Sequence, residues 1–257
     1  MIEYIWLIPV GMIISTFASV IGIGGGLIWA PFFILLLGME PQHAAMYSFA
    51  VQIVGMGSAA ITNILHKNIY WKLVFFLMPL IFIGELAGSF INQRIASPDV
   101  LQGAMGVMSI FVSLFFAFQP ERYDAVLNED RKTKPPCWMM GLCIPFGSFS
   151  GLFSVGIGDN LVPLFRSKLK ISMTNAVGTC LFLNLVIALV GLVLHLCLSG
   201  NNFGFLNLDI LVMCWIGVFV GGQVGPRVSG SIGDNRLKEM FIFILMLIGI
   251  HLIYKAM

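Results

Sequence analysis

The chain has 257 residues, of which 58% are hydrophobic and 10% are charged, and its formal net charge is +2. Soluble domains carry about 25% charged residues, so the composition excludes a soluble globular protein and predicts an integral membrane protein whose main partner is the lipid bilayer. The small net charge also argues against a nucleic-acid partner.

The apolar runs of the first half, broken at charges, proline and glycine, predict five helical segments. They cover Tyr4–Ile21, Leu27–Leu37, His43–Leu65, Leu73–Asn92 and Val100–Phe118. A membrane-spanning helix needs about 20 mostly apolar residues, and the second segment is too short to span alone. We expect it to be a half-helix or one half of a broken helix. Residues 1–118 are thus predicted to form a first transmembrane repeat.

A charged connector, residues 119–136, follows and is predicted to be cytoplasmic. The five segments after it cover Cys137–Val155, Asn160–Phe165, Ser172–Leu198, Asp209–Val228 and Glu239–Tyr254. The second of these is again too short to cross a bilayer alone. Residues 137–257 are predicted to form a second transmembrane repeat.

The basic loops predict the orientation of the chain. They are residues 66–72, 119–136, 166–170 and 226–238, and each neighbouring pair is separated by two crossings. All four therefore fall on one side, which the positive-inside tendency identifies as the cytoplasmic side of a bacterial inner membrane. Because each half has an odd number of segments, the halves are expected to be inverted in topology. The predicted fold is an all-α polytopic membrane protein with two inverted repeats, each carrying a broken or re-entrant helix after a glycine-rich motif.

Three sequence motifs occur in the same order in both halves. Gly22-Ile23-Gly24 matches Gly156-Ile157-Gly158, the segment 44–49 matches 175–180, and 84–90 matches 221–227. In the second pair Ser48 lies against Thr179, and both members of the third pair contain Gly-x-x-x-Gly, which favours close helix packing. Together the three matches suggest an internal duplication.

The pattern G-x-G-G-G followed by proline, then A-x-x-x-[ST], then G-x-x-x-G, present twice, resembles the TauE/SafE sulfite-exporter family of bacterial membrane proteins. The resemblance covers nearly the whole chain and implies an exporter of sulfite, sulfoacetate or a related organosulfur anion. The second repeat departs from the family pattern, because Asp159 and Asn160 stand where a further Gly-Gly is usual. The departure bears on the substrate more than on the fold.

The glycines predict a substrate-binding site at each broken helix. Non-helical backbone inside a membrane is tolerated only where it is buried or lines a wet cavity, and a helix that begins there presents amide groups and a positive dipole end to an anion. The alternative is that the glycines only allow close helix packing. The glycines concerned are Gly22, Gly24, Gly25, Gly26, Gly156 and Gly158.

Two acidic residues are candidates for proton or ion coupling. A carboxylate at membrane depth is costly and is usually functional or paired. Asp159 is expected to carry a proton or a cation, or else to cap the following helix together with Asn160. Glu85 shares one helix face with Ser89 and Asn92 and is a candidate proton carrier, or a partner in an inter-helix hydrogen bond or ion pair.

Two polar stripes at helical spacing complete the candidate residues. The first runs through Ser48 and Gln52 to Asn63 and is predicted to line a pathway, and Asn175 and Thr179 are predicted to contact substrate in the second half. The second stripe runs from Asn184 to His195 and is expected to serve helix association. His195 is expected to lie at the membrane interface, near the outer end of its segment. Arg94 and Arg227 are secondary candidates for attracting an anion at a pathway mouth, and otherwise interfacial anchors.

The predicted function is secondary transport of a small anion by alternating access, with possible proton coupling. No phosphate-binding loop of the form GxxxxGK[ST] is present, and the dispersed histidines and absent HExxH and GxSxG motifs argue against an enzyme. No cofactor or metal is expected. An anion channel, a non-transporting scaffold and a membrane-embedded enzyme are the alternatives, and a homo-oligomer is left open.

Overall fold

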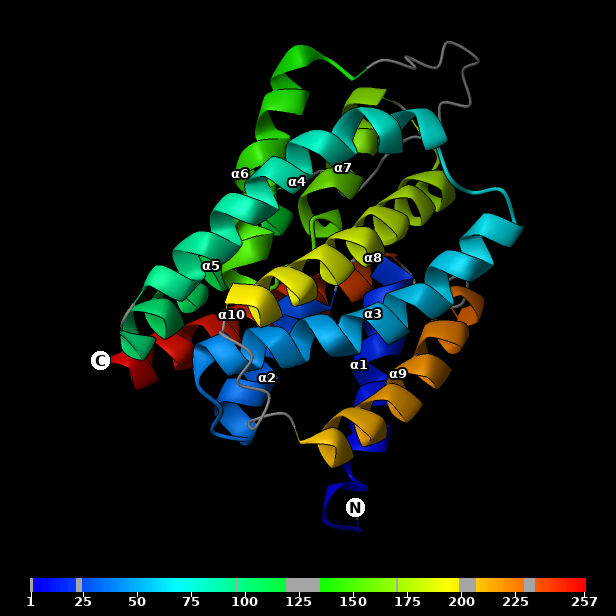
Figure 1. Cartoon of the computed structure of the whole chain (residues 1–257). Helices are drawn as coiled ribbons and strands as arrows, with labels where there is room; N and C mark the ends of the chain where they lie inside the picture. Colours follow the sequence, from blue (N-terminus) through cyan, green and yellow to red (C-terminus); the bar gives the residue numbers. More distant parts are fainter. Residues whose placement is uncertain are drawn as a thin grey trace.

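Ten α-helices make up nearly all of the chain that the computed structural model describes, which is residues 2–21, 25–95, 97–118, 135–169, 171–198, 207–228 and 234–257. No strand occurs in these ranges. Figure 1 shows the helices packed side by side in one bundle. The predicted connector, residues 119–136, lies almost wholly outside the described residues.

A short 3₁₀ turn (η1) precedes the first five helices, which match the five segments predicted for the first half to within a few residues. Their bounds are η1 Ile2–Tyr4, α1 Leu7–Ile21, α2 Gly26–Leu36, α3 Pro41–Leu65, α4 Trp71–Arg94 and α5 Pro98–Ala117.

The second half repeats this order of long and short helices. Their bounds are α6 Cys137–Phe153, α7 Gly158–Leu169, α8 Met173–Leu198, α9 Leu208–Val228 and α10 Asp234–Ala256. Two predicted boundaries are wrong. α10 begins at Asp234 and not at Glu239, so residues 234–238 of the predicted basic loop 226–238 are helical. Residues 166–169 belong to α7 and not to a basic loop, because basic residues are favourable in the last turn of a helix although they end an apolar run.

Five of the described helices are long and apolar enough to cross a bilayer, namely α3, α4, α5, α8 and α9. Their composition and the all-helical architecture confirm the predicted polytopic membrane fold. Large apolar side chains remain exposed along them, such as Phe75 at 74% and Ile61 at 58%. Such side chains face hydrocarbon at no cost, whereas a water-facing surface of this kind is rare.

Glycines bring two pairs of helices into backbone contact. In α4 and α6, a Cβ added to Gly84 would meet the Cα of Gly147 at 2.9 Å, and one added to Gly151 would meet the amide nitrogen of Ser89 at 2.6 Å. In α1 and α9, a Cβ on Gly217 would lie 3.1 Å from the Cα of Gly11. Small residues allow this close approach in membranes. The sequence-based interpretation of Gly84 as a packing residue is confirmed.

The contacts also fix the directions of the helices. In the α3–α8 pair, Gly57 lies next to Leu185 while Gly178 lies next to Asn63, so the two helices are antiparallel. The residue numbers rise together in the α4–α6 and α1–α9 pairs, so each of these pairs is parallel.

α2 turns back along the bundle. Gly26 at its start lies beside Gln52, and Phe33 further along packs on Tyr47, so α2 is antiparallel to α3. α1 instead runs parallel to α9, and α9 runs parallel to α3. α1 and α2 therefore form a hairpin and are not two halves of one straight helix.

Candidate functional site

The first interruption, which we call break 1, lies between α1 and α2. Gly25 has a φ of 71°, in the left-handed region that favours glycine, and it offers no side-chain cap to the first amides of α2. Gly26 is equally constrained, because a Cβ on it would overlap the carbonyl oxygen of Ser154. Gly22 and Gly24 lie outside the described residues.

The second interruption, break 2, lies between α6 and α7. Ser154 directly follows α6 with a φ of 56°, and its amide donates to the carbonyl of Ser150 at 2.7 Å. It is followed by a buried stretch, residues 155–157, before α7 begins at Gly158. Gly156 lies in this stretch and is buried. Both predicted interruptions of helical structure are therefore present.

Gln52 on α3 joins the two breaks. Its Nε2 lies 3.0 Å from the Ser154 carbonyl oxygen, 2.7 Å from the Ser154 hydroxyl and 2.9 Å from the Ser48 hydroxyl. The Ser154 hydroxyl in turn donates to Ser48 at 3.0 Å. Because Gly26 also packs against Gln52, the start of α2 and the end of α6 meet at one amide side chain.

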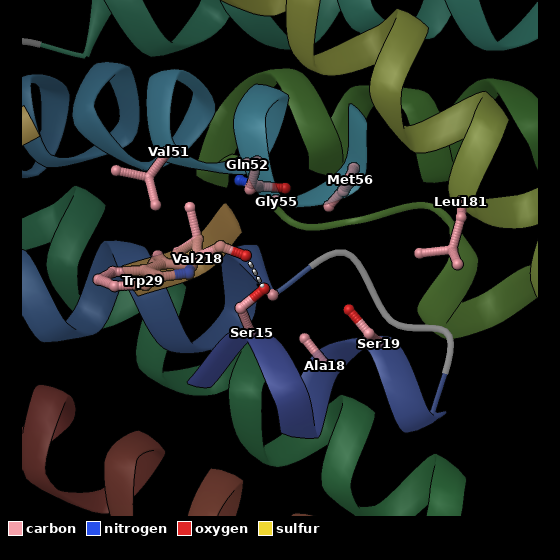
Figure 2. A pocket seen from close by; sticks show the side chains of 11 residues that line it. Ser15, Ala18, Ser19, Trp29, Val51, Gln52, Gly55, Met56, Leu181 and Val218 are labelled. Atoms are coloured by element: carbon pink, nitrogen blue, oxygen red, sulfur yellow. Dashed lines mark hydrogen bonds between the residues drawn. The ribbon is translucent and has the colours of Figure 1, made fainter. Parts of the chain in front are cut away.

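A small cavity of about 20 Å³ opens at this junction (Figure 2). Break 1 contributes Gly25, α3 contributes Gln52 and Gly55, and α1 contributes Ser15 and Ser19. Among the described residues, its lining carries hydroxyl and amide groups and no charged side chain. The volume suits about one water molecule, far below the roughly 300 Å³ of a typical ligand pocket. The site is therefore nearly closed in this conformation.

The Ser15 hydroxyl of α1 holds that helix against α9 beside the cavity. The Ser15 hydroxyl donates to the carbonyl of Val218 at 2.9 Å, as Figure 2 shows. Ser15 is 5% exposed. The sequence reading missed Ser15 and Ser154, because a single serine in an apolar run carries no signal until the fold shows what it faces.

The N-terminus of α7 has its own amide side chain. The Gly158 amide donates to Oδ1 of Asn184 at 3.0 Å. Asn184 is 3% exposed, and its Nδ2 has no hydrogen-bond partner within the described ranges. Gln52 in the first half and Asn184 in the second thus occupy comparable places beside a short helix. The side chains of Asp159 and Asn160 lie outside the described residues.

Two predicted substrate contacts lie elsewhere on α8. The Thr179 hydroxyl accepts from the amide of Tyr70 at 3.0 Å and donates to the carbonyl of Asn175 at 2.6 Å. The bond from Tyr70 ties the start of α8 to the start of α4. The structure does not bring Asn175 and Thr179 into the cavity lining.

Glu85 is fully buried where α4, α6 and α8 meet. The Ser150 hydroxyl lies beside the carboxyl group, but neither carboxyl oxygen has a partner that meets hydrogen-bond geometry. Ser89 and Asn92, on the same helix face, are also fully buried. Their predicted common face is therefore an inward face. Gln223 lies apart from it and donates to Ser58 at 2.7 Å.

His195 is buried between helices in the last turns of α8. Its side chain is 0% exposed, and Nε2 donates to the carbonyl of Gly151 at 2.9 Å. The close contact of α4, α6 and α8 encloses the last turns of α8, and the bond to Gly151 serves the helix association that was expected of the stripe from Asn184 to His195. The helical spacing of His195 from Asn184 was the signal that could have indicated a shared inward face.

Arg94 does not join the site. Arg94 is exposed at the end of α4, with its guanidinium carbon 4.6 Å from the ring centre of Phe90. The side chain of Arg227 lies outside the described residues. Within the described ranges, no group of three His, Cys, Asp or Glu side chains is placed to hold a metal ion.

Comparison with known proteins gives a consistent picture over the whole chain. A family model described as "Sulfite exporter TauE/SafE" matches residues 7–252. The "Probable membrane transporter protein YunE" of Bacillus subtilis (strain 168) is 24% identical over 99% of this chain and 98% of its own length. YfcA of Escherichia coli (strain K12), with the same descriptive name, is 24% identical over 96% and 88%. MJ0441 of Methanocaldococcus jannaschii, also so named, is 22% identical over 98% and 97%. No solved structure matches the chain.

Proposed function

Because the chain belongs to the sulfite exporter TauE/SafE family, we propose that this multi-pass membrane transporter exports sulfite or a small organosulfonate such as sulfoacetate. The junction of breaks 1 and 2 at Gln52 carries the proposal. Two chain interruptions that are far apart in sequence meet around one buried amide and two hydroxyls. Backbone of this kind is tolerated at membrane depth where it lines a cavity.

The chemistry of the junction suits an oxyanion. α2 begins there without a side-chain cap, so its first amides and its positive dipole end are directed toward the break. The described residues that line the cavity include no acidic side chain that would repel a sulfonate. The hydroxyl and amide groups of Ser15, Ser19 and Gln52 add hydrogen-bonding capacity. Gly156 and Gly158 are assigned the matching role at break 2.

We infer that the two halves are inverted repeats. α1 packs on α9 and α4 on α6, while α3 packs on α8 and α5 on α10. Exchanging the first five helices with the last five converts this set of pairings into itself. Matched helices such as α3 and α8 are antiparallel, which a two-fold axis in the membrane plane requires and an axis along the membrane normal forbids. This arrangement supports alternating access to one shared site.

The proposal includes location and energy source. The end of the bundle that holds the α3–α4 loop, with Lys67 and Lys72, is assigned to the cytoplasm of a bacterial inner membrane. Proton coupling through Glu85 supplies the driving force, because the chain has no nucleotide-binding loop. Asp159 is a second candidate for this coupling.

The test is transport by purified protein in proteoliposomes. We expect counterflow of sulfite or sulfoacetate that saturates with concentration and is absent for taurine and acetate. Binding of the true substrate also raises the apparent melting temperature by mass action. Linear flux without saturation would contradict a carrier, and the absence of flux for every sulfur oxyanion would contradict the proposed substrate class.

Gly25→Leu is the diagnostic variant. A leucine at a φ of 71° is strained, so we expect flux to fall at least tenfold. Gly141→Leu is the matched control, because an added side chain there has open space within 4 Å. Normal flux in Gly25→Leu would remove break 1 from the mechanism.

A further inference from the structure

Several polar atoms are buried without partners where α4, α6 and α8 meet. They are both carboxyl oxygens of Glu85, the hydroxyl of Ser89 and Oδ1 of Asn92, within the described ranges. All three residues are 0% exposed. Buried polar atoms in native proteins are nearly always hydrogen-bonded to protein or to ordered water. Because Glu85, Ser89 and Asn92 share one helix face, water entering between the three helices would meet polar partners along that face.

The neighbouring helix leaves room for the carboxyl group. A Cβ on Gly191 of α8 would lie 2.5 Å from Oε1 of Glu85 and 2.7 Å from the ring of Phe49. Any larger residue at position 191 would displace the carboxyl group. On the other side, Ser150 of α6 provides a hydroxyl. Glu85 therefore occupies a fitted recess, with Gly191 and the Phe49 ring on one side and the Ser150 hydroxyl on the other.

His195 is the titratable group nearest the other end of this face. Its Nε2 donates to the Gly151 carbonyl, and its Nδ1 lies 3.4 Å from Nε2 of Gln93. Because an amide nitrogen only donates, Nδ1 accepts there and the neutral imidazole carries its proton on Nε2. Asn92 lies alongside and donates to the carbonyl of Leu152 at 2.6 Å.

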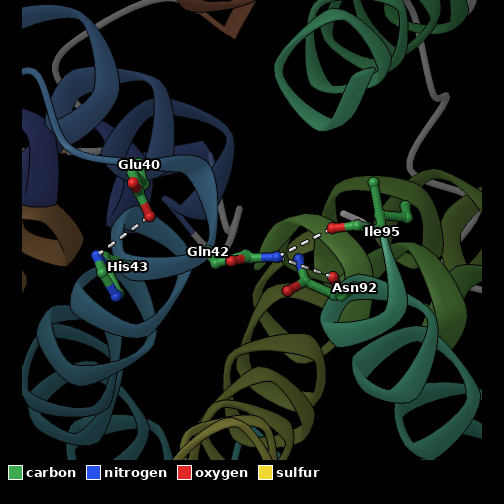
Figure 3. A network of polar contacts seen from close by, with 5 residues as sticks. All are labelled: Glu40, Gln42, His43, Asn92 and Ile95. Carbon is green, nitrogen blue, oxygen red and sulfur yellow. Dashed lines mark hydrogen bonds and ion pairs between the residues drawn. The ribbon is translucent and has the colours of Figure 1, made fainter. Parts of the chain in front are cut away.

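Other titratable groups on the packed helices lie away from this face. Cys143 of α6 is a buried thiol that donates to Met139 within its own helix. His43 of α3 lies 3.9 Å from Glu40 at the start of that helix, and Figure 3 shows the pair apart from Asn92. Arg94 of α4 is exposed. Within the described ranges, Glu85 and His195 are the carboxyl group and the imidazole that lie along this face.

The polar face runs toward one end of the bundle. From Glu85 it leads past Ser89 to Asn92, where Gln42 of α3 donates to the Asn92 and Ile95 carbonyls at 3.4 and 3.2 Å (Figure 3). This is the C-terminal end of α4, opposite the α3–α4 loop. The repeat has no counterpart to Glu85, because Gly222 matches it and packs against Gly55 and Ser58.

We propose that Glu85 is a proton site that, until breaks 1 and 2 rearrange, exchanges with only one aqueous phase, at the end of the bundle where α4 and α8 terminate, through water along Ser89, Asn92 and His195. This rests on the proposed function and deepens it. A proton from that phase converts the Glu85 carboxylate to the neutral acid. The proton leaves Glu85 for the opposite aqueous phase when breaks 1 and 2 rearrange. Because the α3–α4 loop is assigned to the cytoplasm, this end of the bundle faces outward. In an exporter, the entering proton therefore moves in the opposite direction to the departing anion.

Water access can be measured without any substrate. Ser89→Cys and Asn92→Cys are made in a background in which the exposed Cys137 and Cys197 are serine. Ag⁺, small enough to enter a water file, is applied to one face of oriented vesicles, and the thiols left free are counted with a maleimide after unfolding. We expect reaction from the outer face at least tenfold faster than from the inner face. Ser113→Cys, a fully buried serine of α5, is the control and stays unreactive.

Proton movement is the second measurement. With sulfoacetate, whose groups stay ionised near neutral pH, a dye inside proteoliposomes reports protons moved per sulfoacetate. We expect Glu85→Gln to reduce that ratio at least tenfold, Glu85→Asp to restore part of it and Ser113→Ala to leave it unchanged.

The outcomes separate this inference from the proposed function. Thiols at positions 89 and 92 as unreactive as the Ser113→Cys thiol, or reactive from the inner face, would overturn the one-sided path whatever the substrate is. A normal proton ratio in Glu85→Gln would overturn the role of Glu85 while transport stands. Absence of sulfoacetate flux in the unaltered protein, with outer-face reactivity present, would contradict the proposed substrate and support the path.

Discussion

At the scale of single residues, the molecule concentrates its buried polar chemistry on a few side chains. Gln52 contacts three oxygen atoms from Ser48 and Ser154, and it is 4% exposed. Buried polar groups of this kind are costly to leave unpaired. The junction of the two breaks therefore depends on the Gln52 side chain, which is long enough to contact Gly26 at break 1 and Ser154 at break 2.

Gln52→Leu removes that amide and leaves the Ser154 carbonyl unpaired. We expect a loss of about 1–3 kcal/mol in stability and loss of anion flux. Gln102→Leu is the matched control, because Gln102 is also buried but makes a single 3.3 Å bond to Leu252 between α5 and α10. Thermal unfolding and counterflow separate the two effects. Equal retention of flux in both variants would contradict a role for Gln52 in the site.

Gly191 positions Glu85 by lacking a side chain. Gly191→Ala would bring a Cβ within 2.5 Å of the carboxyl group, so we expect the proton-to-sulfoacetate ratio to fall while the protein still folds. Gly57→Ala is the control, because its nearest contact would be Leu185 at 3.7 Å. Measuring the ratio in proteoliposomes tests the prediction, and an unchanged ratio in Gly191→Ala would show that the recess has no part in coupling.

At the scale of helices, glycine positions decide which pairs touch. α4 crosses α6 where Gly88 approaches the backbone of Leu152, and α1 crosses α9 where Gly221 approaches Thr16. In a membrane the lipid tails are as apolar as the side chains, so close packing and not the hydrophobic effect favours one partner over another. These crossings consequently hold the scaffold on which the breaks are placed.

Gly88→Ala tests this role. The added Cβ would meet the amide nitrogen of Leu152 at 2.9 Å and the Ser148 backbone closer still, and backbone cannot yield as a side chain does. Overpacking of this kind costs about 1–3 kcal/mol, which lowers the melting temperature in detergent. Gly103→Ala, with an ordinary 3.5 Å contact to Ala256, is expected to melt as the unaltered protein does.

At the scale of the whole molecule, the hairpins of α1–α2 and α6–α7 approach the junction from opposite halves. α6 runs parallel to α4, away from the end of the bundle where α8 begins. α7 ends next to the start of α8, so it runs back and forms a hairpin with α6, as α2 does with α1. A site formed in this way belongs to neither half. Small movements of one half against the other would change access to it from either side.

The loop positions make the topology testable. His66 in the α3–α4 loop and Gly38 before α3 are exposed at opposite ends of α3. With Cys137 and Cys197 replaced, we expect Gly38→Cys to react with a membrane-impermeant maleimide in intact cells and His66→Cys to react only after lysis. The reverse labelling would contradict the assigned orientation.

Helix positions and the membrane fold could be predicted from the sequence, because apolar length and composition are local properties. Each of the ten predicted segments corresponds to a helix, and both glycine-rich interruptions occur where the motifs placed them. The error at α7 arose because charges at its end were read as loop.

The tertiary structure alone decided which polar residues meet. The sequence placed Gln52 on a polar stripe but carried no sign that Ser154 would be its partner 102 residues away. It also carried no sign that neighbouring helices would enclose the His195 side chain completely. Periodicity identifies a face of a helix, whereas the partner of that face depends on where glycines let two backbones approach, which is a property of the packed bundle.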